Sequence, residues 1–181
     1  MLNHKTYKNR GVRVSPRSKE NIKGLANAFR DVYAQINLHQ KLDLLKLIEV
    51  ILPRMTNLKF EFILIEKEEM GEVEAAMSPD RMKMYIRNDV YERLHQDDAR
   101  ARFTIAHEIG HFVLHDEVAL TRSSQNKHEP FRDSEWQADC FAAELLAPIQ
   151  ACKEYSTIED IMNNFGISYS CARIRFNETK N

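Results

Sequence analysis

Residues 107–111 read His-Glu-Ile-Gly-His and lie inside an apolar run that extends from 103 to 114. On an α-helix, residues four apart project within about 40° of each other, one turn along the same face, so His107 and His111 can reach one ion. Glu108 falls beside them, placed to touch a water on the metal rather than the metal itself. The spacing therefore predicts a helix that holds zinc and carries a general base.

The opposite side of this predicted helix is apolar, and it consists of Ile105, Ala106, Ile109, Phe112 and Val113. One side of the helix is therefore expected to pack against the core, while the other side carries the metal-binding histidines and the glutamate. The alternatives are coincidence and histidines that serve only the core. A chain with seven histidines matches the bare pattern by chance roughly 2% of the time, and core histidines would not require the intervening glutamate.

The composition predicts one domain, because 181 residues with 43% hydrophobic content suffice for one core and are too few for two. We expect residues 1–20 to form a basic N-terminal arm and residues 21–181 to form the domain, with a helical segment at its C-terminal end. Seven of the first 23 residues are cations, although the net charge is −1. A solvated arm is favoured over a nucleic-acid contact, because neither aromatic residues nor a periodic pattern accompanies the charges.

The three cysteines, Cys140, Cys152 and Cys171, are odd in number and show no paired spacing. This favours a reducing compartment over a disulfide framework. The N-terminus lacks an apolar core of signal-peptide length, and the chain has no run of about 18 apolar residues. We therefore expect a soluble cytoplasmic protein without a membrane partner.

Hydrophobic periodicity predicts the remaining elements. In the first half of the chain, helices are expected over 21–35, over 42–52 with Pro53 as the stop, and from a cap at Asn88 or Asp89 through Leu94. The helix that carries the histidines is expected to begin at a cap at Asp97 or Asp98. Three more helices are expected after it, from Asp133 or Ser134 to about Ala147, over 158–164 and over 169–176. Strands are expected over 58–65, 73–77 and 82–87, the last two as a hairpin, and a polar loop over 115–135. The fold class is α+β, mostly helical, with a small antiparallel sheet of about three strands beside the active-site helix.

A catalytic zinc takes three protein ligands and keeps a position for water, so one ligand must come from elsewhere. The downstream candidates are His115, Asp116, Glu117, His128, Glu129, Asp133 and Glu135. Glu135 is preferred because small residues surround it on its helix face and allow another helix to approach closely. Asp139, one turn later, is placed to accept a hydrogen from a ligating imidazole. His115 lies one turn after His111 but drifts off the face, which favours packing or an outer contact.

The quoted residues resemble the ImmA/IrrE family of metallopeptidases over about residues 98–148. The resemblance lies in Arg102-Phe-Thr-Ile-Ala-His-Glu-Ile-Gly-His111, in Leu114-His115, and in Glu135-x-x-Ala138-x-x-Phe141-Ala142-x-x-Leu145-Leu146-x-Pro148. It implies a zincin-type fold, zinc bound by the two histidines and Glu135, and a cytoplasmic bacterial or mobile-element setting. Members of this family are associated with cleaving or relieving helix-turn-helix repressors. The N-terminus lacks a convincing helix-turn-helix, so the repressor would be a separate protein.

For the mechanism, we expect Glu108 to accept a proton from water and to return it to the leaving amine. The strand at 82–87 would offer a sheet edge to an extended peptide, unless it is an ordinary half-buried strand. His128 and Tyr85 are candidates for stabilising the oxyanion.

Two other functions remain open. One is a DNA-binding regulator that uses a helix-turn-helix over 158–174, although its second helix offers only Arg173 and Arg175 as cations. The other is a zinc-bearing anti-repressor that binds its partner without hydrolysis.

Overall fold

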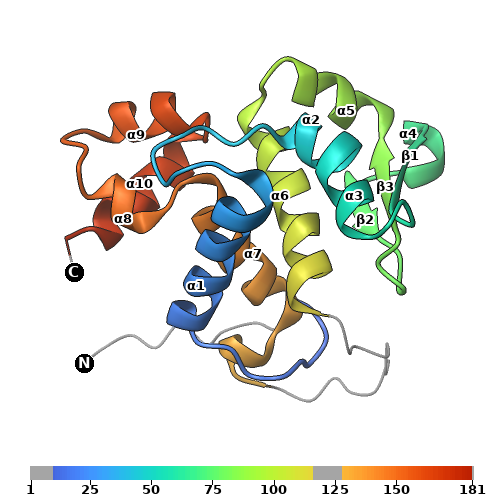
Figure 1. The fold of residues 1–181 in the computed structure, drawn as a ribbon, viewed down its shortest axis with the longest axis horizontal. Coiled ribbons are helices and arrows are strands. Elements are labelled where there is room, and N and C mark those ends of the chain that lie inside the picture. Colours follow the sequence, from blue (N-terminus) through green and yellow to red (C-terminus); the bar gives the residue numbers. More distant parts are fainter. Residues whose placement is uncertain (1–9, 116–127, 181) are drawn as a thin grey trace.

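The computed structural model describes residues 10–115 and 128–180 and has a central pair of helices flanked by two smaller parts (Figure 1). The pair is α6 (Ala99–Leu114) and α7 (Ser134–Leu146), and α1 (Lys19–Phe29) packs against α7. A three-stranded sheet with α5 (Asn88–His95) lies on one side. The other side holds α8 (Ile149–Cys152), α9 (Ile158–Phe165) and α10 (Tyr169–Glu178). The mostly helical α+β prediction is confirmed.

The sheet is mixed rather than antiparallel, which corrects one part of the prediction. Its strands are β1 (Glu61–Ile65), β2 (Ala75–Met77) and β3 (Lys83–Arg87), in the order β1-β3-β2. β2 and β3 form the predicted antiparallel hairpin, whereas β1 pairs with β3 in parallel. The connection over residues 66–74 contains α4 (Lys67–Met70) and leads from β1 to β2, leaving a gap between these two strands that β3 later occupies. β3 therefore returns between the other two strands, in the direction of β1.

The strand predicted to offer an edge to a peptide is the central one, so that prediction is wrong. Ile86 of β3 pairs with Leu64 on one side and with Ala75 on the other. Both sides of β3 are thus occupied, because a central strand uses its backbone groups in two ladders. The strand that lies against α6 and keeps one unpaired side is β2.

Pro53 does not stop the second helical run, contrary to the prediction. The run comprises α2 (Leu44–Lys46), a π-helical turn (Leu47–Ile51) and α3 (Leu52–Met55). The N–H of Leu52 bonds to the carbonyl of Leu47, five residues back. This wider turn accommodates a proline, whose ring would clash with the carbonyl four residues earlier in a regular α-helix. A similar π-helical turn, Arg30–Ala34, extends α1.

The other predicted boundaries shift by a few residues. The first strand begins at Glu61 because Asn57 and Leu58 adopt left-handed backbone conformations, with φ of 53° and 63°. α5 follows Arg87, and neither predicted cap is used, because Asp89 pairs with Arg87 instead. A short 3-10 helix (Pro130–Arg132) precedes α7.

The core lies between the central helices and the elements on both sides. On α6, the predicted apolar face is buried, with Ile105, Ala106 and Ile109 at 0% exposure. All three cysteines are free, as predicted. Within the described residues, no helix combines the length and apolar character needed to cross a membrane.

Candidate metal centre and substrate cleft

α6 places the two histidines of the motif together. Asp98 caps this helix, accepting a hydrogen bond from the Ala101 N–H at 2.9 Å, which agrees with one of the two predicted caps. Nine residues into the helix, His107 presents its Nε2 atom 3.0 Å from Nε2 of His111. Two nitrogen donors therefore converge on one side of α6, as the four-residue spacing predicts.

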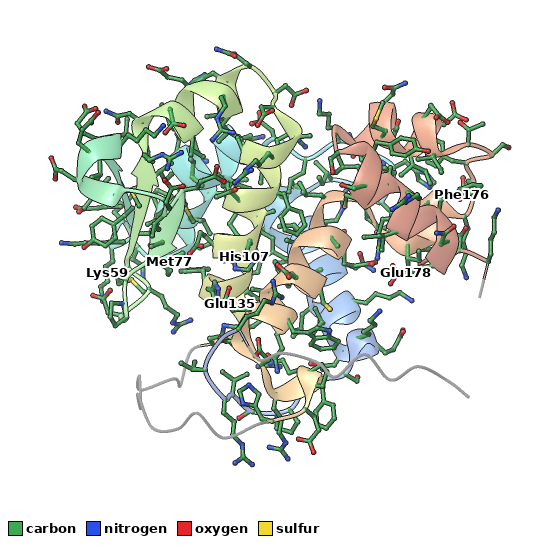
Figure 2. The ribbon with its side chains drawn as sticks, turned by 180° about the vertical axis from the view of Figure 1, so that it is seen from behind. Lys59, Met77, His107, Glu135, Phe176 and Glu178 are labelled. Atoms are coloured by element: carbon green, nitrogen blue, oxygen red, sulfur yellow. The ribbon has the colours of Figure 1, made fainter. Side chains whose placement is uncertain are left out.

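α7 brings Glu135 to the same point. Asp133 caps α7 by accepting the Trp136 N–H at 3.1 Å, so Glu135 lies in the first turn. Its Oε2 lies 3.2 Å from Nε2 of His107, and its Oε1 lies 3.3 Å from Nε2 of His111. Figure 2 shows His107 and Glu135 beside each other on the two helices.

These distances fit a tetrahedral metal ion. Ligand atoms at about 2.0–2.1 Å from zinc are about 3.3 Å apart in a tetrahedron. Here the two Nε2 atoms are 3.0 Å apart, and each has one oxygen of the Glu135 carboxylate at 3.2 Å (Oε2, to His107) or 3.3 Å (Oε1, to His111). Two imidazoles and one carboxylate form a donor set typical of catalytic zinc. The residues present therefore fit the metal that the motif predicts.

Small residues allow α6 and α7 to approach closely, which confirms the prediction made for the α7 face. A Cβ added to Gly110 would lie 3.1 Å from both Cα and the carbonyl oxygen of Ala138. Ala138 and Ala142 are both fully buried. The close contact lets the short side chain of Glu135 reach the imidazoles of α6.

A second carboxylate, that of Glu108, lies in the same centre. Ligand atoms of Glu108, His107 and His111 lie within 4.8 Å of one another. Glu108 is 8% exposed and accepts a hydrogen bond from the backbone of Met77 in β2. Burial raises its pKa, against the opposing charges of His111 and His107. Since Glu135 is within hydrogen-bonding distance of both Nε2 atoms, Glu135 fits the ligand position and Glu108 fits the position of a base.

Asp139 lies on the far side of the His107 ring. Its Oδ1 is 2.9 Å from Nδ1 of His107, and its Oδ2 accepts a hydrogen bond from Nη2 of Arg10 at 2.5 Å. Burial lowers the pKa of His107, but hydrogen bonds to Asp139 and Glu135 outweigh it and raise this pKa to about 9. Hydrogen bonds to His107 and His111 hold the pKa of Glu135 well below its usual value. Once His107 has lost the proton on Nε2, its Nδ1–H remains directed at Asp139 and leaves the Nε2 lone pair for a metal.

His115 contacts the second imidazole. Its Nδ1 lies 3.0 Å from Nδ1 of His111, and its Nε2 lies 3.2 Å from Oε1 of Gln137. Burial, followed by the charge of His111, lowers the pKa of His115 to about 4, so its ring is neutral. The structure therefore places His115 against Nδ1 of His111, away from the Nε2 atom that faces Glu135, and His115 also borders the cleft described next.

A cleft of about 620 Å³ opens beside the centre, and Glu108, His111 and Glu135 line it. One wall is β2 with the following turn as far as Arg81, and the other is the N-terminal segment Arg10–Val12. This segment follows α7 closely, because the N–H groups of Arg10 and Gly11 bond to Oδ2 of Asp133 at 3.0 and 3.2 Å. No sequence pattern indicates this wall, since residues 10–12 belong to the basic stretch for which a solvated arm is expected.

The structure does not bring His128 and Tyr85 to the cleft. His128 places Nε2 3.2 Å from Oδ2 of Asp133, with its side chain 4% exposed. Tyr85 is on the central strand β3. Among the described residues that line the cleft, neither is present. Two other ligand candidates, Asp116 and Glu117, fall outside the described residues.

A model of a known protein family matches the chain. The family model described as the IrrE N-terminal-like domain, Peptidase_M78, matches residues 65–177, which is more than half of the chain and includes both α6 and α7. This confirms the resemblance drawn from the motifs. No curated protein matches the chain.

Proposed function

The chain belongs to the Peptidase_M78 family of metallopeptidases, and from that premise we propose that it is a zinc-dependent endopeptidase that hydrolyses a peptide bond in a protein. The observation that carries the proposal is the convergence of His107, His111 and Glu135, whose donor atoms lie 3.0 to 3.3 Å apart. Such a centre, with a buried glutamate beside it and a cleft in front, suits hydrolysis of a bound peptide.

In this proposal, His107, His111 and Glu135 hold zinc, and Glu108 moves the proton. When bound, zinc lowers the pKa of its water to about 7 and polarises the substrate carbonyl. Glu108 accepts the proton of the attacking water and returns it to the leaving amine. The raised pKa of Glu108 suits both steps, because a base that must later act as an acid works best with a pKa near the operating pH. The hydrogen bond from Met77 holds the carboxylate between the metal position and β2.

The substrate would lie along β2. This strand pairs with β3 on one side, and the bond from Met77 to Glu108 shows that its backbone also faces the centre. An extended peptide adding to that side would gain main-chain hydrogen bonds and pass the metal position. We therefore assign to β2 the role that the sequence suggested for residues 82–87.

We propose a separately encoded helix-turn-helix repressor as the target, and the cytoplasm as the compartment. The support for the target is the resemblance of the motifs to the ImmA/IrrE family, whose members act on such repressors. The support for the compartment is the presence of three free cysteines.

Only one of the two cations expected to contact DNA is exposed. Arg175 of α10 is buried and pairs with Glu144 of α7, so it belongs to the core. Arg173 remains exposed on that helix. One cation is a weak basis for tracking phosphates, so we do not favour this function.

The test is incubation of the purified protein with a helix-turn-helix repressor encoded beside its gene, followed by mass spectrometry of the products. We expect cleavage by the parent protein and intact repressor when a chelator is present. Glu108→Gln should retain zinc but cleave about 10²- to 10⁴-fold more slowly, whereas Glu129→Gln, which changes an exposed side chain, should cleave like the parent. Repressor that stays intact in every tube, yet releases its operator DNA with Glu108→Gln as with the parent, would instead establish the non-hydrolytic anti-repressor.

A further inference from the structure

Gln137 is a fully buried polar residue of α7 to which the proposed mechanism gives no role. Its Nε2 lies 2.8 Å from the carbonyl oxygen of Ser15 and 2.8 Å from that of Phe131. Both carbonyls only accept hydrogen bonds, so the amide atom that faces them must be the nitrogen. The two amide hydrogens are thereby used, and the orientation of the side chain is fixed, with Oε1 directed away from both carbonyls.

The fixed amide determines where His115 carries its hydrogen. Oε1 of Gln137 lies 3.2 Å from Nε2 of His115. An amide oxygen only accepts, so Nε2 of His115 must carry a hydrogen. A neutral imidazole has one such hydrogen, so Nδ1 of His115 is left with a lone pair.

His115 in turn determines the tautomer of His111. The two Nδ1 atoms lie 3.0 Å apart, and a hydrogen bond between them needs one donor and one acceptor. Since Nδ1 of His115 accepts, this contact is a hydrogen bond only when Nδ1 of His111 donates. In the neutral ring the lone pair of His111 is then on Nε2, whereas the carboxylate of Glu135, which only accepts, favours a hydrogen on this same atom while no metal is bound.

We propose that Gln137 is a positioning residue of the metal centre, which acts through His115 to hold His111 in the tautomer that can bind metal. The opposite tautomer would place a hydrogen on Nε2 and exclude the ion. The inference rests on the proposed function, because it assumes that the centre holds zinc. The two ligating imidazoles are then oriented by different groups. His107 is oriented by the carboxylate of Asp139, and His111 by a series of hydrogen bonds between uncharged groups that runs through His115 and Gln137 to the backbone of Ser15.

The first test is the tautomer itself, measured by long-range ¹H–¹⁵N correlation spectra of the metal-free protein. We expect His111 to carry its hydrogen on Nδ1 and His115 to carry its hydrogen on Nε2. Hydrogens on the opposite nitrogens would overturn the proposal. This measurement needs no variant and no activity, so it decides the proposal even if substitution of Gln137 prevents folding.

The second test is zinc affinity, measured by competition with a chromophoric chelator. Gln137→Met keeps the size of the side chain but removes the acceptor, and we expect about 10- to 100-fold weaker zinc binding and mixed tautomers of His111. The matched control is Ser134→Ala, which removes the acceptor of the Val12 N–H at 3.1 Å and so loosens the same N-terminal segment. The control should bind zinc like the parent, because it leaves the Gln137 amide in place.

A double-mutant cycle separates action through His115 from general packing. In a His115→Phe background, adding Gln137→Met should cause no further loss of zinc affinity. A loss as large as in the parent background, or parental zinc affinity in a folded Gln137→Met protein, would overturn the proposal. A parent protein that binds no zinc would contradict the proposed function instead, while the spectra would still report on the chain of hydrogen bonds.

Discussion

Gly110 and Ala138 bring the backbones of α6 and α7 into contact, because a Cβ on Gly110 would lie 3.1 Å from Cα and the carbonyl oxygen of Ala138. Both neighbouring atoms belong to the backbone of a helix, which yields less readily than a side chain. The metal centre depends on this contact, since Glu135 lies on α7 one turn before Ala138 and must reach the imidazoles of α6.

Gly110→Ala should therefore destabilise the protein. Overpacking costs about 1–3 kcal/mol, which exceeds the gain of about 1 kcal/mol from replacing a helical glycine by alanine. Gly24→Ala is the matched control, because a Cβ at this helical position meets nothing within 4 Å. Urea unfolding should show a lower free energy of unfolding for Gly110→Ala and a higher one for Gly24→Ala. Equal stabilisation by both would show that the helices can separate freely.

Loss of a residue that hydrogen-bonds to a metal ligand weakens metal binding by about 10- to 100-fold. Glu135→Gln should weaken zinc binding by more than this, because Glu135 is proposed to bind the metal itself. The substitution preserves the shape of the side chain but removes the negative charge that balances the ion. Chelator competition measures the effect, with the exposed Glu129→Gln as control. Parental affinity in Glu135→Gln would mean that Glu108 is the third ligand.

Zinc affinity should fall as the pH decreases below about 9, the pKa to which Asp139 and Glu135 raise His107 against the effect of burial. Below this pH, the metal-free His107 carries an extra proton that zinc must displace, so the affinity should drop about tenfold per pH unit. Asp139→Asn removes the main acceptor and lowers that pKa, which should flatten the dependence between pH 7 and 9. Calorimetry in buffers of different ionisation enthalpy counts the released protons. An equal release from both proteins would contradict the role of Asp139.

Arg175→Met should destabilise the fold by about 3–5 kcal/mol, because it leaves the buried carboxylate of Glu144 without its cation. The side chains of Arg175 and Glu144 are 7% and 5% exposed, and the pair joins α10 to α7. Arg173→Met, on the exposed face of α10, should have little effect on urea unfolding. The double variant Arg175→Met/Glu144→Leu should recover much of the loss. If it were less stable than Arg175→Met alone, the charge of Glu144 would not be the cause.

The centre on α6 was predictable because its geometry is local. A four-residue spacing fixes the relation between His107 and His111 on any regular helix, and the apolar residues on the other face predict which side is buried. A second local pattern, the small residues on its helix face, favours Glu135. Both patterns lie within single helices, so no knowledge of the rest of the fold was needed.

Elements that depend on long-range pairing were less predictable. The direction of β1 relative to β3 is set by where the connection over 66–74 carries the chain, and the edge position of β2 follows from it. The sequence predicts a stop at Pro53 because a π-helical turn has no clear sequence signal.

The sequence by itself determined the spacing of His107, Glu108 and His111 and the helix that carries them, because helical periodicity acts over a few residues. Only the tertiary structure decided that β2 borders the centre, that residues 10–12 form the opposite wall, and that Gln137 stands behind His115. Those relations join segments that are far apart in the sequence, such as Ser15 and Gln137, which are separated by 122 residues. They form only when the packing of the whole domain brings their hydrogen-bonding groups together.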